Sequence, residues 1–307
     1  MTADRTTGFT DIDRQHWSLR HLPPAARPFG RLARWDRPIG TWLLLFPCWW
    51  SLALAVGRDW AHLLGWMVLF ALGALAMRGA GCTWNDILDR KIDAEVERTR
   101  SRPLPSGEVG LRGAIVWMVL QALVGAVILF KFNKFAVLVG LGSLLIVAIY
   151  PLMKRITSWP QVVLGFAFNW GALLGFAAVT GTLSKATVAL YFGGVAWTMV
   201  YDTIYAMQDQ RDDAIVGVRS TARRFAGAPR LWLVFFAVLA VALWVAVGLL
   251  APLHPPYFVV LAAVAVHFGW QIADLKPHDQ RDCLAKFKAN AHVGWLMLAA
   301  IVAGQFG

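Results

Sequence analysis

The sequence has little charge for its length. Only 15% of its 307 residues are charged, whereas 58% are hydrophobic and 16 are Trp. A soluble domain carries about 25% charged residues. Repeated apolar runs of about 20 residues match the length that an α-helix needs to cross a bilayer. The composition therefore excludes a soluble globular protein and predicts an all-α, polytopic membrane protein.

Features of two other protein classes are also scarce. The three cysteines, Cys48, Cys82 and Cys283, are odd in number and widely spaced, so we expect reduced thiols and no disulfide framework or metal-ligand pattern. The phosphate-binding signatures GxGxxG and GxxxxGK[ST] are absent from the loops that we predict to be cytoplasmic. These loops therefore carry no nucleotide-binding fingerprint.

The N-terminus lacks the pattern of a targeting peptide. Residues 1–17 have no apolar core and no small-residue cleavage site, and they contain Asp4, Asp11 and Asp13. We therefore expect no signal peptide, and the acidic residues argue weakly against a mitochondrial transit peptide. The predicted location is a cell inner membrane of a bacterium, with an organellar inner membrane as the alternative.

Nine apolar runs are long enough to cross a membrane as helices. We accordingly predict an N-terminal cytoplasmic segment over residues 1–37 and one nine-helix transmembrane domain over residues 38–307. The predicted spans are approximately 39–57, 61–80, 111–130, 134–152, 161–180, 186–205, 230–251, 256–274 and 289–305.

The basic residues alternate between the two sides of these spans. With nine spans, 25 of the 29 Lys and Arg residues fall on the side of the N-terminus. Because Lys and Arg are retained on the cytoplasmic side, this asymmetry predicts a cytoplasmic N-terminus and a periplasmic C-terminus. It also explains the net charge of +11 better than nucleic-acid binding does, since the basic residues lie in short loops.

The first cluster of acidic residues follows the second predicted span, in NDILDRKID (85–93). On a helix, Asp86, Asp89 and Asp93 fall within about 60° of one another, and Asn85 is an i,i+4 neighbour of Asp89. The spacing predicts a stripe of carboxylates that projects from the cytoplasmic end of the span.

A second cluster follows the sixth predicted span, in YDTIYAMQDQRDD (201–213). If the helix continues, Asp202, Asp209 and Asp213 fall within about 40° of one another, and Asp212 lies off this stripe. The loop after the second span is about 30 residues long, and the loop after the sixth span is about 24 residues long. Loops of this length in a compact bundle are usually functional.

Adjacent carboxylates repel one another and need a compensating cation. Carboxylate oxygens suit Mg²⁺, which keeps waters and shares itself with substrate phosphates. Two facing stripes would hold a diphosphate through metal bridges and stabilise it as a leaving group. The alternative is a solvated polar loop whose acids pair with its arginines, and the presence of two stripes at equivalent places disfavours it.

Basic residues are the expected second component of such a site. Lys154 and Arg155 lie at the end of the fourth span, where a short loop would bring them beside the aspartates. Arginine forks match phosphate and carboxylate geometry, and lysine offers a point charge. For Arg98, Arg223 and Arg224, which follow the clusters, cytoplasmic retention is the favoured explanation.

The two aspartate clusters and their flanking segments resemble those of the UbiA superfamily of intramembrane prenyltransferases. NDILDRKID is similar to the NDxxDxxxD signature of that family, and DQRDD (209–213) is similar to the DxxxD of its second motif. The blocks RWDRPIGTWLLLFPCWW, RSRPLPSG, YPLMKRITSWPQVVLGFAFNWG and YDTIYAMQDQRDDAIVGVRSTA resemble the branch that acts on 4-hydroxybenzoate. The middle of the second motif departs from the DxEGD found elsewhere in the superfamily.

The resemblance implies nine helices around a central cavity, an active site on the cytoplasmic side, and Mg²⁺ as cofactor. It implies transfer of a polyprenyl chain from a polyprenyl diphosphate to the ring carbon of 4-hydroxybenzoate ortho to the hydroxyl, in ubiquinone biosynthesis. Partners would be these two substrates and the lipid bilayer. The implied metal ligands are Asn85, Asp86, Asp89, Asp93, Asp209 and Asp213.

The remaining candidates would bind or shield the substrates. Arg155 is expected at the carboxylate of the acceptor and Lys154 nearer the diphosphate, although the two roles could be exchanged. The aromatic faces of several residues would stabilise an allylic cation, with bundle packing as the alternative for each. The substrate-binding candidates are Asn85, Lys154, Arg155, Tyr150, Asp202, Tyr205, Arg102 and Arg34, and further aromatic candidates are Phe166, Phe168, Trp170 and Tyr201.

Other functions fit the sequence less well. A farnesyl-to-haem transferase of the same superfamily would use histidines such as His254, His267 and His292. An ion-coupled transporter would carry acidic residues near the bilayer midplane, whereas here they cluster at helix ends. A structural scaffold would leave the two carboxylate stripes unexplained.

Overall fold

The computed structural model describes residues 16–96, 99–210, 217–251 and 253–306, and in these ranges every regular element is a helix. The chain forms two compact units. The first contains residues 1–40 and 75–126, and the second contains residues 41–74 and 127–307. Some long helices therefore begin in one unit and end in the other. The predicted boundary between an N-terminal segment (1–37) and a transmembrane domain (38–307) stays a prediction.

In the first unit, short helices precede two long ones. Its small core joins Leu32, Leu104, Val109 and Ala114, with Trp117 packed against them. Because these residues come from three segments, the core fixes the loop after residue 96 against the helices around it. The elements are α1 (Trp17–Arg20), η1 (Pro24–Ala26), α2 (Arg27–Leu32), the second half of α4 (Trp60–Glu95) and most of α5 (Leu111–Leu129).

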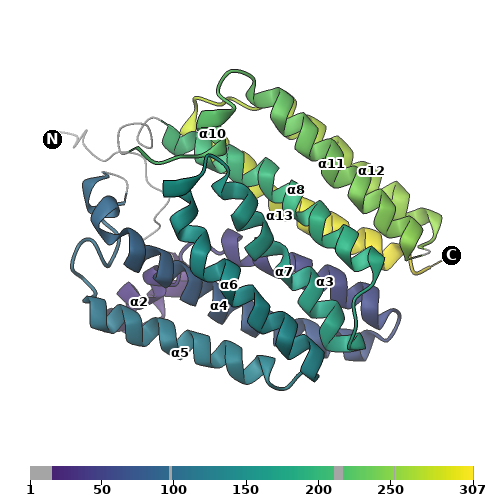
Figure 1. Ribbon diagram of the computed structural model, residues 1–307, viewed down its shortest axis with the longest axis horizontal. Coiled ribbons are helices and arrows are strands. Elements are labelled where there is room, and N and C mark those ends of the chain that lie inside the picture. Colours follow the sequence, from purple (N-terminus) through teal and green to yellow (C-terminus); the bar gives the residue numbers. More distant parts are fainter. Residues whose placement is uncertain (1–15, 97–98, 211–216, 252, 307) are drawn as a thin grey trace. The chain divides into compact units, whose positions relative to one another are not determined.

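The second unit is a bundle of long helices. Helix α8 (Lys185–Ala206) contacts α7, α11 and α13, and these helices run beside it in Figure 1. The other elements are α3 (Ile39–Val56), α6 (Lys134–Ile156), α7 (Pro160–Thr180), η2 (Met207–Asp209), α10 (Thr221–Arg224), α11 (Pro229–Leu250), α12 (Pro255–Ala273) and α13 (Gln280–Ala303).

Seven of the described helices are long and apolar enough to cross a membrane, namely α3, α4, α5, α6, α7, α11 and α12. The other two predicted spans correspond to α8 and α13, which are long but less apolar. Most of α8 is buried within its unit. A helix that is covered by protein does not need a lipid-soluble surface, so its Thr, Tyr and Trp residues lower its hydropathy without exposing polar groups to lipid.

Small residues allow some of these helices to approach closely. A Cβ atom placed on Gly294 of α13 would lie 2.1 Å from a ring carbon of Phe46 in α3, and the indole nitrogen of Trp50 donates a hydrogen bond to the Gly294 carbonyl at 2.9 Å. Phe46 and Trp50 are fully buried. Close approach through small residues is the usual way in which membrane helices associate.

We therefore expect Gly294→Ala to lower stability, because the buried ring of Phe46 has no space to move. Overpacking of this kind costs about 1–3 kcal/mol, which exceeds the gain of about 1 kcal/mol in helix propensity. Gly269→Ala on α12 is the matched control, since nothing lies within 4 Å of its Cβ position. Thermal unfolding in detergent compares the two, and equal midpoints would contradict the prediction.

Candidate functional site

The first aspartate cluster lies on α4, which continues past its apolar part without a break to Glu95. Asp86 and Asp89 are completely buried and Asp93 is 5% exposed. The three carboxylates therefore share one helix, as their spacing predicts. Asn85, on the same turn, is half-buried.

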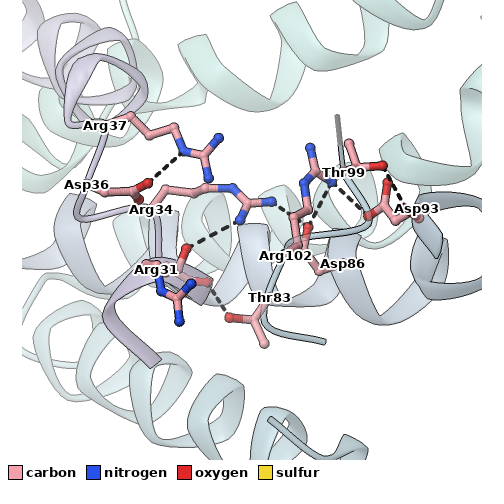
Figure 2. A network of polar contacts seen from close by, with 10 residues as sticks. Arg31, Arg34, Asp36, Arg37, Thr83, Asp86, Asp93, Thr99 and Arg102 are labelled. Atoms are coloured by element: carbon pink, nitrogen blue, oxygen red, sulfur yellow. Dashed lines mark hydrogen bonds and ion pairs between the residues drawn. The ribbon is translucent and has the colours of Figure 1, made fainter. Parts of the chain in front are cut away.

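Two arginines from outside α4 contact these carboxylates (Figure 2). Arg34 Nη2 lies 2.5 Å from Asp86 Oδ1. Arg102 Nη1 lies 2.7 Å from Asp93 Oδ2 and 3.4 Å from the same Asp86 Oδ1. Side chains far apart in the sequence thus bring positive charge to a buried carboxylate pair, which would otherwise be costly to hold ionised.

Arg34 occupies a special backbone position. Its φ of +61° is in the left-handed region, and it is the only described non-glycine residue with a positive φ. This conformation costs roughly 1–2 kcal/mol for a residue with a Cβ atom, so the surrounding structure must hold it. Arg34 also donates a hydrogen bond to the carbonyl of Arg31 at 3.3 Å. The Arg34 guanidinium is therefore held by the Arg31 carbonyl through one nitrogen and by Asp86 through the other.

Another buried arginine in this unit has a different partner. Arg31 pairs with Glu108, which lies outside the aspartate cluster. Arg31 and Arg34 are each 8% exposed. The two arginines therefore have similar environments, and only Arg34 contacts the aspartates.

The oxygen donors of this cluster suit Mg²⁺ in their chemistry. Asp86 Oδ2 is buried and has no hydrogen-bond partner among the described residues. In the described part of the chain no three Asp, Glu, His or Cys side chains are gathered closely enough to hold a metal ion by themselves. This is compatible with Mg²⁺, which is commonly bound by one or two carboxylates together with substrate phosphates and water.

The second cluster differs from the prediction. Helix α8 ends at Ala206 and tightens into the short 3-10 turn η2, so Asp202 and Asp209 do not share one continuous α-helix. The predicted alignment assumed a continuous helix, and this condition is not met between Asp202 and Asp209. The tighter turn lets the backbone N–H of Met207 reach the last carbonyls of α8. Asp213 lies outside the described residues.

The end of α6 is tied to the segment that follows this second cluster. The backbone N–H of Arg219 donates to the carbonyl of Lys154 at 2.9 Å, and Arg219 Nη1 donates to the carbonyl of Ile156 at 2.7 Å. Lys154 is half-buried and Arg155 is exposed. These bonds fix the backbone at the end of α6 beside Arg219, and the expected position of both cations beside the aspartates stays a prediction. Tyr150, about one turn before Lys154 on α6, is half-buried.

Further hydrogen bonds fix the same segment and were not anticipated from the sequence. Gln161 Oε1, at the start of α7, accepts from the backbone N–H of Thr221 at 3.0 Å. The hydroxyls of Thr203 and Thr221 lie 2.7 Å apart, and both residues are fully buried. A polar residue inside an apolar span is the only sequence signal for such a contact, and it does not identify the partner.

The aromatic candidates separate into two groups. Tyr205, on the last turn of α8, packs at 4.6 Å between ring centroids against Phe287 of α13, which also contacts Tyr201. Phe166 stacks on Tyr191, and Trp170 donates its indole N–H to a carbonyl of α6. The second group is engaged in bundle packing, which favours that alternative for Phe166 and Trp170.

The sequence matches known proteins over most of its length. Residues 44–300 match the UbiA prenyltransferase family. A mitochondrial 4-hydroxybenzoate polyprenyltransferase of Drosophila melanogaster is 46% identical over 96% of this chain and 76% of that protein. Proteins of the same name from Arabidopsis thaliana and Rattus norvegicus are each 45% identical over 94% of this chain, and over 71% and 77% of their own lengths.

Solved structures share the fold at low sequence identity. A UbiA homolog from Aeropyrum pernix K1 aligns with a TM-score of 0.72 at 23% identity, over 85% of this chain and 96% of that one. A UbiA homolog from Archaeoglobus fulgidus, described as bound to GPP and Mg²⁺, aligns with a TM-score of 0.65 at 18% identity, over 90% and 99% of the two chains.

These relatives correct one expectation. We predicted a bacterial cell inner membrane, whereas the similar proteins from Drosophila, Arabidopsis and rat are all named as mitochondrial. The predicted location is therefore contradicted. Asp4, Asp11 and Asp13 do not identify the membrane in which the helices lie, because charge in a short N-terminal segment does not determine that membrane. The multi-pass character agrees with the apolar helices.

The Thr203–Thr221 contact can be tested by a double-mutant cycle. Thr203→Val leaves the buried hydroxyl of Thr221 without this partner and should destabilise the protein by about 1–3 kcal/mol. The double variant Thr203→Val/Thr221→Val should cost less than the sum of the single variants, because neither hydroxyl remains. Thermal unfolding in detergent measures the difference, and additive effects would contradict a direct contact.

Proposed function

The chain belongs to the UbiA prenyltransferase family, and from this premise we propose that it is a 4-hydroxybenzoate polyprenyltransferase. It would transfer a polyprenyl chain from a polyprenyl diphosphate to the ring carbon ortho to the hydroxyl, a step of ubiquinone biosynthesis. The observation that carries this proposal is the name shared by relatives that are 45–46% identical over 94–96% of the chain. That name favours hydroxybenzoate over haem as the acceptor.

The proposed cofactor is Mg²⁺. When bound, it would neutralise the diphosphate and stabilise it as a leaving group. The proposal is supported by the oxygen donors on α4, by the buried Oδ2 of Asp86, and by the Mg²⁺ and GPP of the Archaeoglobus homolog. The residues that would hold the metal are Asn85, Asp86, Asp89 and Asp93 of the first motif and Asp209 and Asp213 of the second.

Cationic side chains would orient the two substrates. Arg155 is proposed to bind the carboxylate of 4-hydroxybenzoate through its planar fork, with Lys154 nearer the diphosphate. Support comes from the hydrogen bonds that fix the end of α6 beside residues 217–222. Arg34 and Arg102 are proposed to contact the diphosphate, because both guanidiniums already lie at the aspartates that would hold its metal.

The transfer breaks the bond between C1 of the prenyl chain and the diphosphate oxygen, and the electron pair leaves with the diphosphate. The ring carbon ortho to the phenol oxygen then forms a bond to C1. Water would quench the allylic cation, so an apolar and shielded site is required. The faces of Tyr150 and Tyr205 are proposed to stabilise the cation, and Asp202, half-buried one turn from Tyr205, to line the same place.

The ring proton leaves last and restores aromaticity. Two groups have the lone pair and the charge for this step, a carboxylate of the aspartate motifs and the departing diphosphate. Both lie close to the ring in the proposed arrangement, since the diphosphate carries the carbon under attack. One of these two groups, the carboxylate or the diphosphate, would accept the ring proton.

The function is tested with membranes that contain the protein, Mg²⁺, a polyprenyl diphosphate and labelled 4-hydroxybenzoate. We expect an organic-extractable, prenylated product whose formation stops on chelation by EDTA and resumes when Mg²⁺ is restored. Chain lengths from C10 upward should be supplied. Absence of product across these lengths, in membranes that support a known prenyltransferase, would refute the proposal.

The two motifs are tested separately by Asp89→Ala and Asp209→Ala. Each change should lower turnover by a factor on the order of 100 or more, the scale of removing a group that stabilises charge in the transition state. Asp59→Ala is the matched control, because Asp59 is exposed and its carboxylate pairs with His62, outside both aspartate motifs. A near-normal rate in either motif variant, with normal insertion, would remove that aspartate from the site.

A further inference from the structure

The first aspartate motif already has two strong cationic partners. Arg34 and Arg102 both contact Asp86 Oδ1, and Arg102 also contacts Asp93 Oδ2. Figure 2 shows the two guanidiniums on the side of α4 from which these carboxylates project. Any divalent cation that binds the same oxygens must share them with, or displace, a guanidinium.

The burial of these groups makes the competition strong. The side chains of Arg34 and Arg102 are 10% and 12% exposed, and that of Asp86 is completely buried. Charges at such sites are poorly screened by water and salt, so a guanidinium close to Asp86 opposes a second cation there. An arginine remains protonated at any physiological pH and cannot relieve this repulsion by losing its proton.

The diphosphate changes this balance. It brings oxygen atoms with the geometry that arginine forks bind in pairs. A guanidinium that moves from Asp86 Oδ1 to a phosphate oxygen keeps an ionised partner and frees the carboxylate for the metal. Asp86 Oδ2, which is buried and has no hydrogen-bond partner in the described part of the chain, is then the second oxygen available on that carboxylate.

We propose that Arg34 and Arg102 are competitors of the divalent cation at the first aspartate motif. The motif binds the cation weakly by itself and firmly only together with a diphosphate, which takes over the guanidiniums. The site would therefore load its metal with the prenyl diphosphate and not before it. This inference rests on the proposed function, because it assumes that this motif is the metal site.

A purely positioning role of Arg34 and Arg102 predicts the opposite change in cation affinity. If the two arginines only hold the aspartates in a binding geometry, removing either one lowers the affinity for a cation. If they compete with the cation, removing either one raises that affinity and at the same time weakens binding of the diphosphate. The sign of the change in cation affinity therefore separates the two roles.

The experiment uses the purified, full-length protein in detergent and Mn²⁺ as a paramagnetic probe. The electron paramagnetic resonance signal of free Mn²⁺ gives its Kd without any diphosphate present. Arg34→Gln and Arg102→Gln should each bind Mn²⁺ at least about tenfold more tightly than the unaltered protein, a change of ~1.4 kcal/mol. In the presence of Mn²⁺, both variants should bind geranyl diphosphate more weakly.

Arg31→Gln is the matched control. Arg31 has the same exposure as Arg34 and comes from the same segment, but it pairs with Glu108. Its Kd for Mn²⁺ should stay within about twofold, because its charge does not contact the aspartates. When Asp86→Asn is added to the Arg34→Gln variant, the tight Mn²⁺ binding should be lost. This loss would assign the bound Mn²⁺ to the first aspartate motif.

Arg34→Lys provides a second variant if Arg34→Gln does not fold. It keeps the charge and should leave the Mn²⁺ affinity close to that of the unaltered protein. Unchanged or weaker Mn²⁺ binding in both folded glutamine variants would overturn the inference. These measurements need no prenyl transfer, so unchanged Mn²⁺ binding in variants of a protein that does prenylate would contradict this inference alone, whereas absence of prenyl transfer by the unaltered protein would contradict the proposed function.

Discussion

The first unit depends on the neutralisation of buried carboxylates at the end of an apolar helix. Helix α4 carries Asp86, Asp89 and Asp93 into the interior of the protein. Burial of ionised carboxylates is unfavourable unless cationic partners are present. Arg34 and Arg102 provide that charge from segments on either side of α4 in the sequence. The strained backbone of Arg34 is one consequence, because the surrounding contacts hold its guanidinium at Asp86.

The second unit depends on a different arrangement, in which a central helix is covered by its neighbours. Helix α8 is buried along most of its length and contacts α7, α11 and α13. Its polar groups are therefore paired inside the protein. Thr203 meets Thr221, and Trp197 donates to Asn290 of α13 at 2.8 Å. These contacts fix the end of α8 where the second aspartate motif begins.

Both units thus place ionisable groups at helix ends that are fixed by contacts remote in sequence. The end of α6 is held by Arg219, and the start of α7 is held through Gln161. In a membrane, an unpaired polar group is expensive, so each buried polar residue near these ends has a structural partner.

The predicted and observed helices agree along most of the apolar spans. Hydropathy detects residues that face lipid, and the spans that became α3, α5, α6, α7, α11 and α12 were predicted to within a few residues. It missed the first turns of α13, which begins at Gln280, because Lys286 there is buried by pairing with Asp274 and by stacking over Trp270. It also gave no sign that α8 would tighten after Ala206.

The sequence by itself determined the fold class and the two aspartate motifs, because these follow from hydropathy, periodicity and local spacing, and it determined the family through its similarity to known proteins. Only the tertiary structure decided which partner each charged or polar group has. Arg34 pairs with Asp86 across 52 positions of sequence, and Arg31, three residues earlier, pairs with Glu108 across 77. Nothing in the local pattern distinguishes these two arginines. Their partners depend on how helices distant in sequence pack, and that packing is set by contacts that no short stretch of sequence contains.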